Sequence, residues 1–171
     1  MNRRDAITAL SLAPLLHAAS SPAERKRFIG MWKLTSGKST DQATGVVSYP
    51  WGRTPFGRLL YDEAGRVFVQ LMNPGRRSVG GVSNRGAAAA IASSSADDMR
   101  EMLTGFNAYF GTFDIDQAAG TVIHHLQSAL IPSWVGTDQR RRYEFSAAGE
   151  LIILNTASGA DYRLVWQRDG K

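Results

Sequence analysis

Residues 56–72 read FGRLLYDEAGRVFVQLM and indicate a β-hairpin. Apolar and polar side chains alternate on both sides of the sequence DEAG at positions 62–65, and a period of two is typical of a strand with one buried face. The Glu-Ala-Gly sequence supplies the turn between the two strands. The hairpin therefore predicts an antiparallel sheet, and the same alternation recurs on both sides of it along the chain.

Short alternating stretches separated by turn sequences run outward from this hairpin. They bring the number of expected strands to about nine, the others lying at residues 28–38, 43–50, 109–116, 121–130, 138–145, 151–156 and 162–168. A loop rich in glycine, serine and alanine at 73–95 and a helix at 97–108, capped by Ser95, interrupt the pattern. The expected fold is all-β, an up-and-down antiparallel β-barrel with one helix-containing insertion.

Composition and charge narrow the function classes. A chain of 171 residues fits one domain with a sizeable core, and the lack of cysteine excludes disulfides, thiolate nucleophiles and cysteine-ligated metals. The net charge is +5, but the basic residues are scattered, and the side chains of the run Arg140–Arg142 alternate between two faces of a strand. Because no nucleic-acid-binding motif accompanies these basic residues, nucleic acid is not an expected partner. No cofactor is expected either.

The first 23 residues have the organisation of an export signal. Arg3 and Arg4 precede a short apolar segment at 6–16 and small residues at 18–20. Residues 1–23 are thus predicted to be a signal peptide of the twin-arginine type, with 24–171 as the barrel domain and a periplasmic or secreted location. The alternative is an N-terminal helix of a cytoplasmic protein. The apolar segment is too short for stable membrane insertion.

Several stretches together resemble a known family. IGMWKL contains Gly30-Met31-Trp32, the Gly-x-Trp sequence of the first lipocalin strand, and YPWGRTPFGRLLYDEAGRVFVQLM, AYFGTFDIDQAAGTVIHHLQSALIPSWVGTDQRRRYEF and RLVWQR add more specific likeness. From Phe28 to Arg168 the chain resembles the bacterial and fungal lipocalin-like domain family, departing from it mainly near residues 85–95. The resemblance implies a calycin-type barrel around a small-molecule cavity, and it implies no particular reaction.

Strand geometry sorts the adjacent His124 and His125 onto opposite faces of the strand at 121–130. The face with the more apolar ends should point into the barrel, and it consists of Val122, His124, Leu126, Ser128 and Leu130. On the strand at 138–145 the aromatic face should point inward, and it consists of Arg141, Tyr143 and Phe145. These strands are expected to be neighbours, so that His124 and Arg141 line one lumen.

Candidate ligand-binding residues come from these faces and from the barrel ends. Trp134 lies in the loop IPSWVGTD, and loops at a barrel mouth commonly contact ligands. The helix at 97–108 is expected to close the other approach. Tyr49 and Tyr61 are further polar side chains whose facing the sequence leaves open. The predicted ligand-binding set is His124, Arg141, Trp134, Tyr143, Tyr109, Gln70 and Trp32.

An arginine inside the barrel needs a partner, because an uncompensated buried charge is costly. The partners considered are a ligand carboxylate or the side chains of Asp138, Asp114, Trp32 and Trp134. Alternatively, Arg141 closes one barrel end over Trp32, as arginines do in lipocalins, and Arg163 and Arg168 compete for that role.

Metal binding and nucleophilic catalysis have little support. Adjacent histidines on a strand point apart and cannot chelate one ion, so no metal site is expected. There is no Gly-x-Ser-x-Gly sequence, and Ser128 lies about 13 Å from His124 along an extended strand. We therefore expect binding of a small apolar or amphipathic molecule. The alternatives are an isomerase-like or cyclase-like enzyme of the same fold and a structural periplasmic protein with a filled barrel.

The export hypothesis predicts a dependence on the arginine pair. Replacing Arg3 and Arg4 by lysine should block periplasmic delivery, because the twin-arginine route reads this pair. Cell fractionation of a bacterial host measures the outcome, with a chain lacking residues 1–20 as the cytosolic control. Unchanged delivery would indicate the general secretory route instead.

Overall fold

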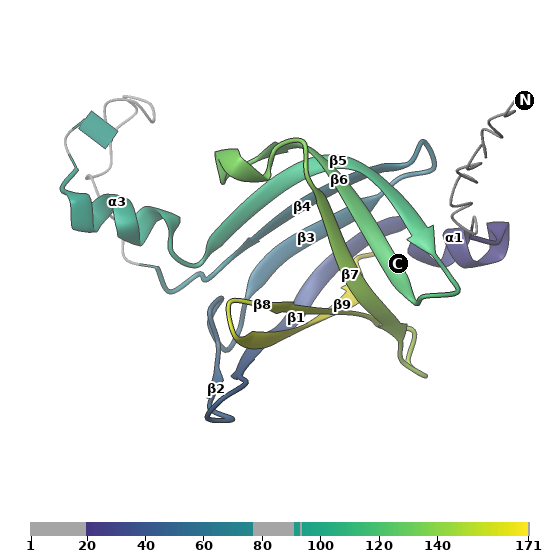
Figure 1. Ribbon diagram of the computed structural model, residues 1–171, viewed down its shortest axis with the longest axis horizontal. Helices are drawn as coiled ribbons and strands as arrows, with labels where there is room; N and C mark the ends of the chain where they lie inside the picture. Colours follow the sequence, from purple (N-terminus) through teal and green to yellow (C-terminus); the bar gives the residue numbers. More distant parts are fainter. Residues whose placement is uncertain (1–19, 77–90, 93, 171) are drawn as a thin grey trace, which may run out of the picture.

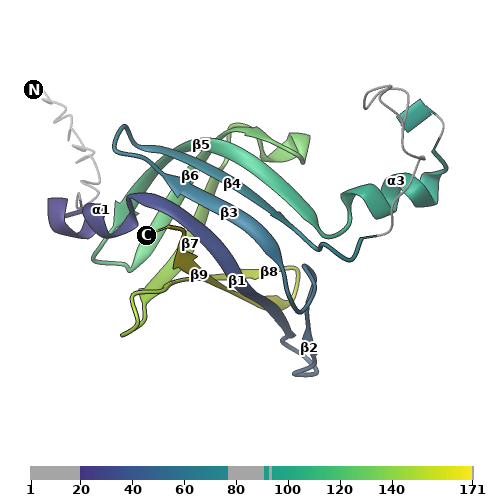
Figure 2. The same cartoon turned by 180° about the vertical axis from the view of Figure 1, so that it is seen from behind.

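The structure is a computed structural model that describes residues 20–76, 91–92 and 94–170. Most of these residues form strands around one central space (Figures 1 and 2). In chain order the elements are α1 (Pro22–Phe28), β1 (Gly30–Asp41), β2 (Val47–Ser48), β3 (Phe56–Tyr61), β4 (Arg66–Met72), α3 (Ala96–Leu103), β5 (Phe106–Asp116), β6 (Thr121–Ala129), the 3-10 turn η1 (Pro132–Trp134), β7 (Asp138–Phe145), β8 (Leu151–Ala157) and β9 (Ala160–Arg168).

The strands form a closed eight-stranded antiparallel barrel. From β3 to β9 each strand pairs with the next in the chain, and β1 pairs with both β3 and β9 to close the sheet. The two residues of β2 only extend the edge of β1, so the strand expected at 43–50 is far shorter than predicted. The predicted all-β up-and-down barrel with a helix-containing insertion is confirmed, since α3 lies between β4 and β5.

Helix α1 covers one end of the barrel. Ser21 caps it by accepting a hydrogen bond from the Glu24 amide, and it presents the fully buried Phe28 to the interior. The Phe28 ring makes edge-to-face contacts with Tyr61, Tyr143 and Phe145, at centroid distances of 5.3, 4.8 and 5.2 Å. The first strand, predicted at 28–38, starts at Gly30 instead, because α1 extends to Phe28. Residues 1–19, where most of the predicted signal lies, are outside the described part of the chain.

Arg168 completes the closed end, and Gly30 makes room for it. Its guanidinium lies 4.4 Å from the centre of the Trp32 ring and donates hydrogen bonds of 2.7 Å to the carbonyls of Ile29 and Arg27. A Cβ atom on Gly30 would lie 2.7 Å from Nη1 of Arg168, and the φ angle of +132° also favours glycine. The Gly-x-Trp sequence is thus explained by packing: Gly30 leaves room for the guanidinium that lies over Trp32. Arg168, not Arg141 or Arg163, covers Trp32.

Helix α3 does not close the barrel. Ser95 and Asp98 form a capping box at the start of α3, but the helix buries no residue and projects away from the strands (Figures 1 and 2). It also ends earlier than the expected 97–108, because Gly105 turns the chain with a φ of +70° and β5 starts at Phe106. Most of the loop predicted at 73–95 lies outside the described residues. None of the described helices is long and apolar enough to span a bilayer.

The closed end predicts a stability difference between two arginines. Arg168→Met should lower the free energy of unfolding by about 1–2 kcal/mol, because it removes two charge-assisted hydrogen bonds and a cation–π contact at a partly exposed site. Arg142→Met, on the exposed face of β7, is the control and should change it by less than about 0.5 kcal/mol. Denaturant unfolding measures both, and equal effects would contradict this role of Arg168.

Candidate functional site

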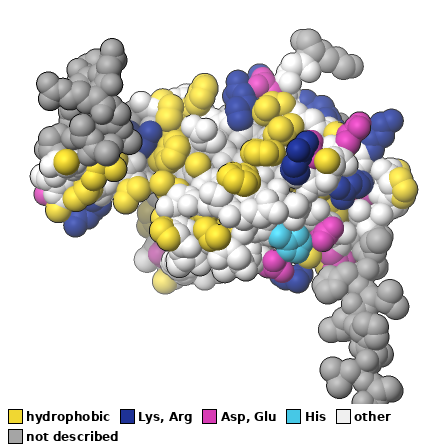
Figure 3. Space-filling model, turned by 90° about the horizontal axis from the view of Figure 1, so that it is seen from above, with side chains coloured by type: hydrophobic (Ala, Val, Ile, Leu, Met, Phe, Trp, Pro, Cys, Tyr) yellow, Lys and Arg dark blue, Asp and Glu magenta, His cyan; other side chains and the backbone are white. Residues whose placement is uncertain are grey.

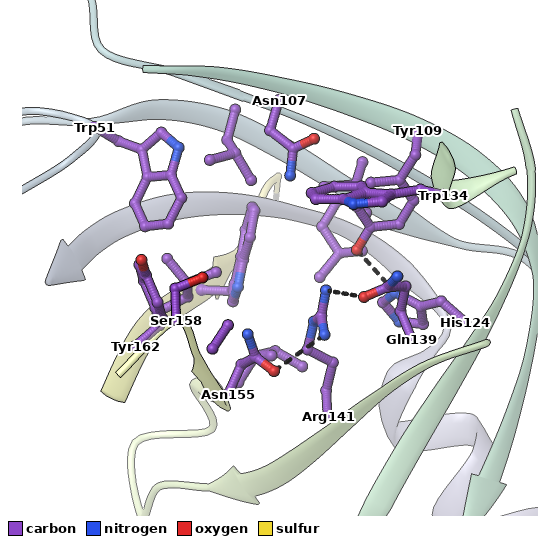
Figure 4. Close-up of a pocket in the computed structure, with 17 residues that line it drawn as sticks. Trp51, Asn107, Tyr109, His124, Trp134, Gln139, Arg141, Asn155, Ser158 and Tyr162 are labelled. Carbon is purple, nitrogen blue, oxygen red and sulfur yellow. Dashed lines mark hydrogen bonds between the residues drawn. The ribbon is translucent and has the colours of Figure 1, made fainter. Parts of the chain in front are cut away.

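A cavity of about 440 Å³ lies inside the barrel, away from the end covered by α1. Its walls come from strands on all sides, from η1 and from the segment before β3 (Figure 4). The apolar lining residues are Trp51, Leu59, Val69, Leu71, Trp134, Ile153, Ala157, Leu164 and Trp166. The polar ones are Asn107, Tyr109, His124, Gln139, Arg141, Asn155, Ser158 and Tyr162. Among the lining residues that the structure describes, Arg141 is therefore the only one with a permanent charge.

His124 is held between two tyrosines. Its side chain is buried, Nε2 lies 2.7 Å from the Tyr61 hydroxyl, and Nδ1 lies 2.9 Å from the Tyr109 hydroxyl. Burial and then the nearby Arg141 lower the pKa of His124 to about 3. The imidazole is thus neutral at ordinary pH, with one nitrogen donating and the other accepting.

Arg141 projects from β7 into the cavity, where amide groups hold it. Nη1 donates to Oδ1 of Asn155 and Nη2 donates to Oε1 of Gln139, both at 3.2 Å (Figure 4). Asp114 and Asp138, two of the partners considered for Arg141, do not pair with it, because both carboxylates bond His125 on the outside of the barrel. In the part of the chain that the structure describes, Arg141 has no carboxylate partner.

His125 lies outside, as predicted, and it joins two strands there. Nδ1 is 2.6 Å from Asp138 at the start of β7, and Nε2 is 3.1 Å from Asp114 on β5. Burial alone would lower the pKa of His125, but hydrogen bonds and charge from the two carboxylates outweigh it and raise the pKa. The environment therefore favours the neutral form of His124 and the charged form of its neighbour His125. Among the described residues, no three histidine or acidic side chains are arranged to hold a metal ion.

A model of the lipocalin-like domain family matches residues 29–168, nearly the whole barrel. The chain belongs to the lipocalin-like domain family. No curated protein matches it. For a lipocalin-like domain with an open interior, binding of a small molecule is the general function that this membership indicates.

The lipocalin-like barrel brings four of the seven predicted residues to the cavity: His124, Arg141, Tyr109 and Trp134. It places the other three elsewhere. Trp32 is fully buried at the closed end, and Tyr143 donates a hydrogen bond to Glu24 of α1 at 2.9 Å. Gln70 lies on the outer face of β4, because its neighbours Val69 and Leu71 point inward.

The predicted inward face of β6 is interrupted by a bulge. Gly111 pairs with Leu126 and Phe110 pairs with Ser128, so Gln127 is an extra residue that turns Ser128 outward. The bulge needs glycine on the facing strand, since a Cβ on Gly111 would lie 1.9 Å from the His125 carbonyl oxygen. Ser128 and Leu130, predicted to share the inward face with His124, instead border a hollow on the outer surface.

The predicted set omits thirteen of the seventeen lining residues, and Asn155, Tyr162, Asn107 and Trp51 illustrate why. Asn155 shares the inward face of β8 with Ile153, and Tyr162 shares that of β9 with Trp166, so the alternation of these strands contained the signal. Asn107 lies two residues before Tyr109 on β5, so the same alternation places it on the inward face. Trp51 precedes β3 without periodic neighbours, and only the folded chain brings its ring within 5.9 Å of the Tyr162 ring.

The His125 contacts predict a pH-dependent contribution to stability. Because the folded-state pKa is raised above 6.5, this contribution is fully present below that value and is lost as the pH rises through the folded-state pKa. His125→Gln should therefore destabilise the protein more at about pH 5.5 than at about pH 9. Denaturant unfolding of both proteins at both pH values measures the difference. A loss that does not vary with pH would contradict the predicted charge on His125.

Proposed function

We propose that this lipocalin-like protein binds a small amphipathic molecule in its interior cavity. The cavity itself carries this proposal, since about 440 Å³ with apolar walls and a few convergent polar groups is typical of a small-molecule site. Trp51, Trp134 and Trp166 supply flat apolar surface, and Arg141 and Tyr109 form a polar corner. An interior of this volume argues against the filled, purely structural barrel considered from the sequence.

Binding has more support than catalysis. The enzymatic alternative relies on His124 to move protons, but both of its nitrogens are bonded to tyrosines and its pKa is about 3. No aspartate or glutamate is among the described residues that line the cavity, so a carboxylate base is also missing there. A cavity without an evident base suits a carrier or a sensor of its ligand. For such a protein we propose export, which is supported by the signal-like sequence at 1–23.

A second hollow on the outside of the barrel offers a natural control. It borders β3 to β6, where Phe68 and Phe110 stack at 5.7 Å and are 42% and 43% exposed. Hydrophobic side chains are visible across an outer face of the barrel in Figure 3. Strands do not enclose this outer hollow as they enclose the interior cavity, so we assign ligand binding to the interior.

Binding of N-phenyl-1-naphthylamine, a neutral apolar dye whose fluorescence rises on burial, tests the proposal. Ala157→Trp places a large ring in the lining and should weaken dye binding by about tenfold or more, roughly 1.4 kcal/mol. Ala148→Trp, an equal change in the exposed β7–β8 turn, and Phe110→Thr, at the outer hollow, should leave it unchanged. Dye that binds all variants equally, or that is lost only in Phe110→Thr, would contradict the interior site.

A further inference from the structure

The charge on Arg141 lacks a counter-charge in a largely apolar cavity. Its guanidinium donates hydrogen bonds to the side-chain oxygens of Asn155 and Gln139 and, at 3.5 Å, to the backbone carbonyl of Arg140, and all three acceptors are neutral. No described lining residue is acidic, and no described carboxylate forms an ion pair with Arg141. Amide oxygens orient a guanidinium without neutralising it, and a partly buried cation gains most from an anion.

The hydrogen bonds of His124 determine which way the Tyr109 hydroxyl donates. Tyr61 is fully buried, and His124 Nε2 is its one hydrogen-bond partner among the described residues, so the Tyr61 hydroxyl must donate to Nε2 or bury an unpaired O–H group. The neutral imidazole then carries its proton on Nδ1 and donates to the Tyr109 oxygen. The Tyr109 O–H hydrogen is left to point into the cavity, which Tyr109 lines.

A further unpaired donor belongs to a lining residue of β9. Trp166 is 1% exposed and lines the cavity, and its Nε1–H group has no hydrogen-bond partner within the described residues. The side-chain oxygen of Asn107, an acceptor, is likewise unpaired, and the Ser158 and Tyr162 hydroxyls can both donate and accept. Around Arg141, however, the amide oxygens are already engaged and the groups that remain free are donors.

We infer that the polar end of the ligand is a carboxylate, bound by the Arg141 guanidinium and the Tyr109 hydroxyl. Both groups point toward the same part of the cavity in Figure 4. One permanent positive charge matches one negative charge, which favours a monoanionic carboxylate over a phosphate dianion. The apolar part of the acid would lie against the tryptophan walls. Tyr61 and His124 act as positioning residues, since they fix the direction of the Tyr109 hydroxyl. This inference rests on the proposed function.

Displacement of N-phenyl-1-naphthylamine from the wild-type protein tests the inference without any mutation. Decanoic acid and 1-naphthaleneacetic acid, each compared with its methyl ester near neutral pH, present the same apolar body with and without the charge. At least one acid should bind about tenfold or more tighter than its ester, the effect of a charge-assisted hydrogen bond. Equal displacement by acid and ester, or none by either acid, would overturn the carboxylate. Failure of the dye itself to bind would overturn the proposed function instead.

Variants then assign the selectivity to named groups. Arg141→Met should weaken the preferred acid by about tenfold to 100-fold and leave its ester unchanged, while Arg141→Lys should keep part of the preference. Tyr109→Phe should weaken the acid by about tenfold. Arg140→Met, on the exposed face of the same strand, is the matched control and should behave like wild type. Acid selectivity that survives Arg141→Met would overturn the inference.

The imidazole resonances of His124 test the positioning role separately. Nitrogen-15 NMR of the wild-type protein should show a neutral ring protonated on Nδ1 throughout the range where an ordinary histidine titrates. Tyr61→Phe should change this tautomeric state and reduce the preference for the acid while dye binding persists. A wild-type ring protonated on Nε2 would contradict the donor role of Tyr109.

Discussion

Strand β1 pairs with β9 from Trp32 opposite Arg168 to Asp41 opposite Ala160, and this pairing closes the sheet. Without it, the meander from β3 to β9 would be an open sheet with two edges and no enclosed interior. The interaction that fixes the closure lies at its end, where Arg168 covers Trp32 and bonds the carbonyls of Ile29 and Arg27. Gly30 permits this approach, because a side chain at this position would meet the Arg168 guanidinium.

The two halves of the barrel interior use polar groups differently. At the closed end Phe28, Trp32 and their aromatic neighbours fill the space, and the polar atoms there are satisfied, with Trp32 donating to the Phe28 carbonyl and Tyr143 to Glu24. In the cavity half, Trp166 and Asn107 retain unpaired polar atoms, and Arg141 retains an uncompensated charge. Filled cores avoid such groups because they cost free energy, whereas a binding site keeps them for its ligand.

His124 and His125 show how strongly the environment sets the state of a side chain. They are adjacent in sequence, but burial beside Arg141 keeps the first neutral, and two carboxylates favour the charged form of the second. The alternation of a strand separates them by the thickness of the barrel wall. The interior histidine can therefore order a hydrogen-bond chain, while the outer one joins β6 to the carboxylates of Asp114 on β5 and Asp138 on β7.

The sequence by itself determined the barrel and, on the two strands whose faces it assigned, the sides on which His124, His125 and Arg141 lie. The period of two is a local property, so it placed His124 and Arg141 inside and His125 outside before any contact was known. The position of each side chain along the barrel axis was decided only by the tertiary structure, because strand register and the closure of the barrel end depend on residues distant in sequence. Arg141 and Tyr143 share a face, yet one reaches the cavity and the other meets α1. Long-range contacts, which no local pattern contains, also decide the bulge at Gln127, the packing of α1 on the barrel end and the position of Trp51.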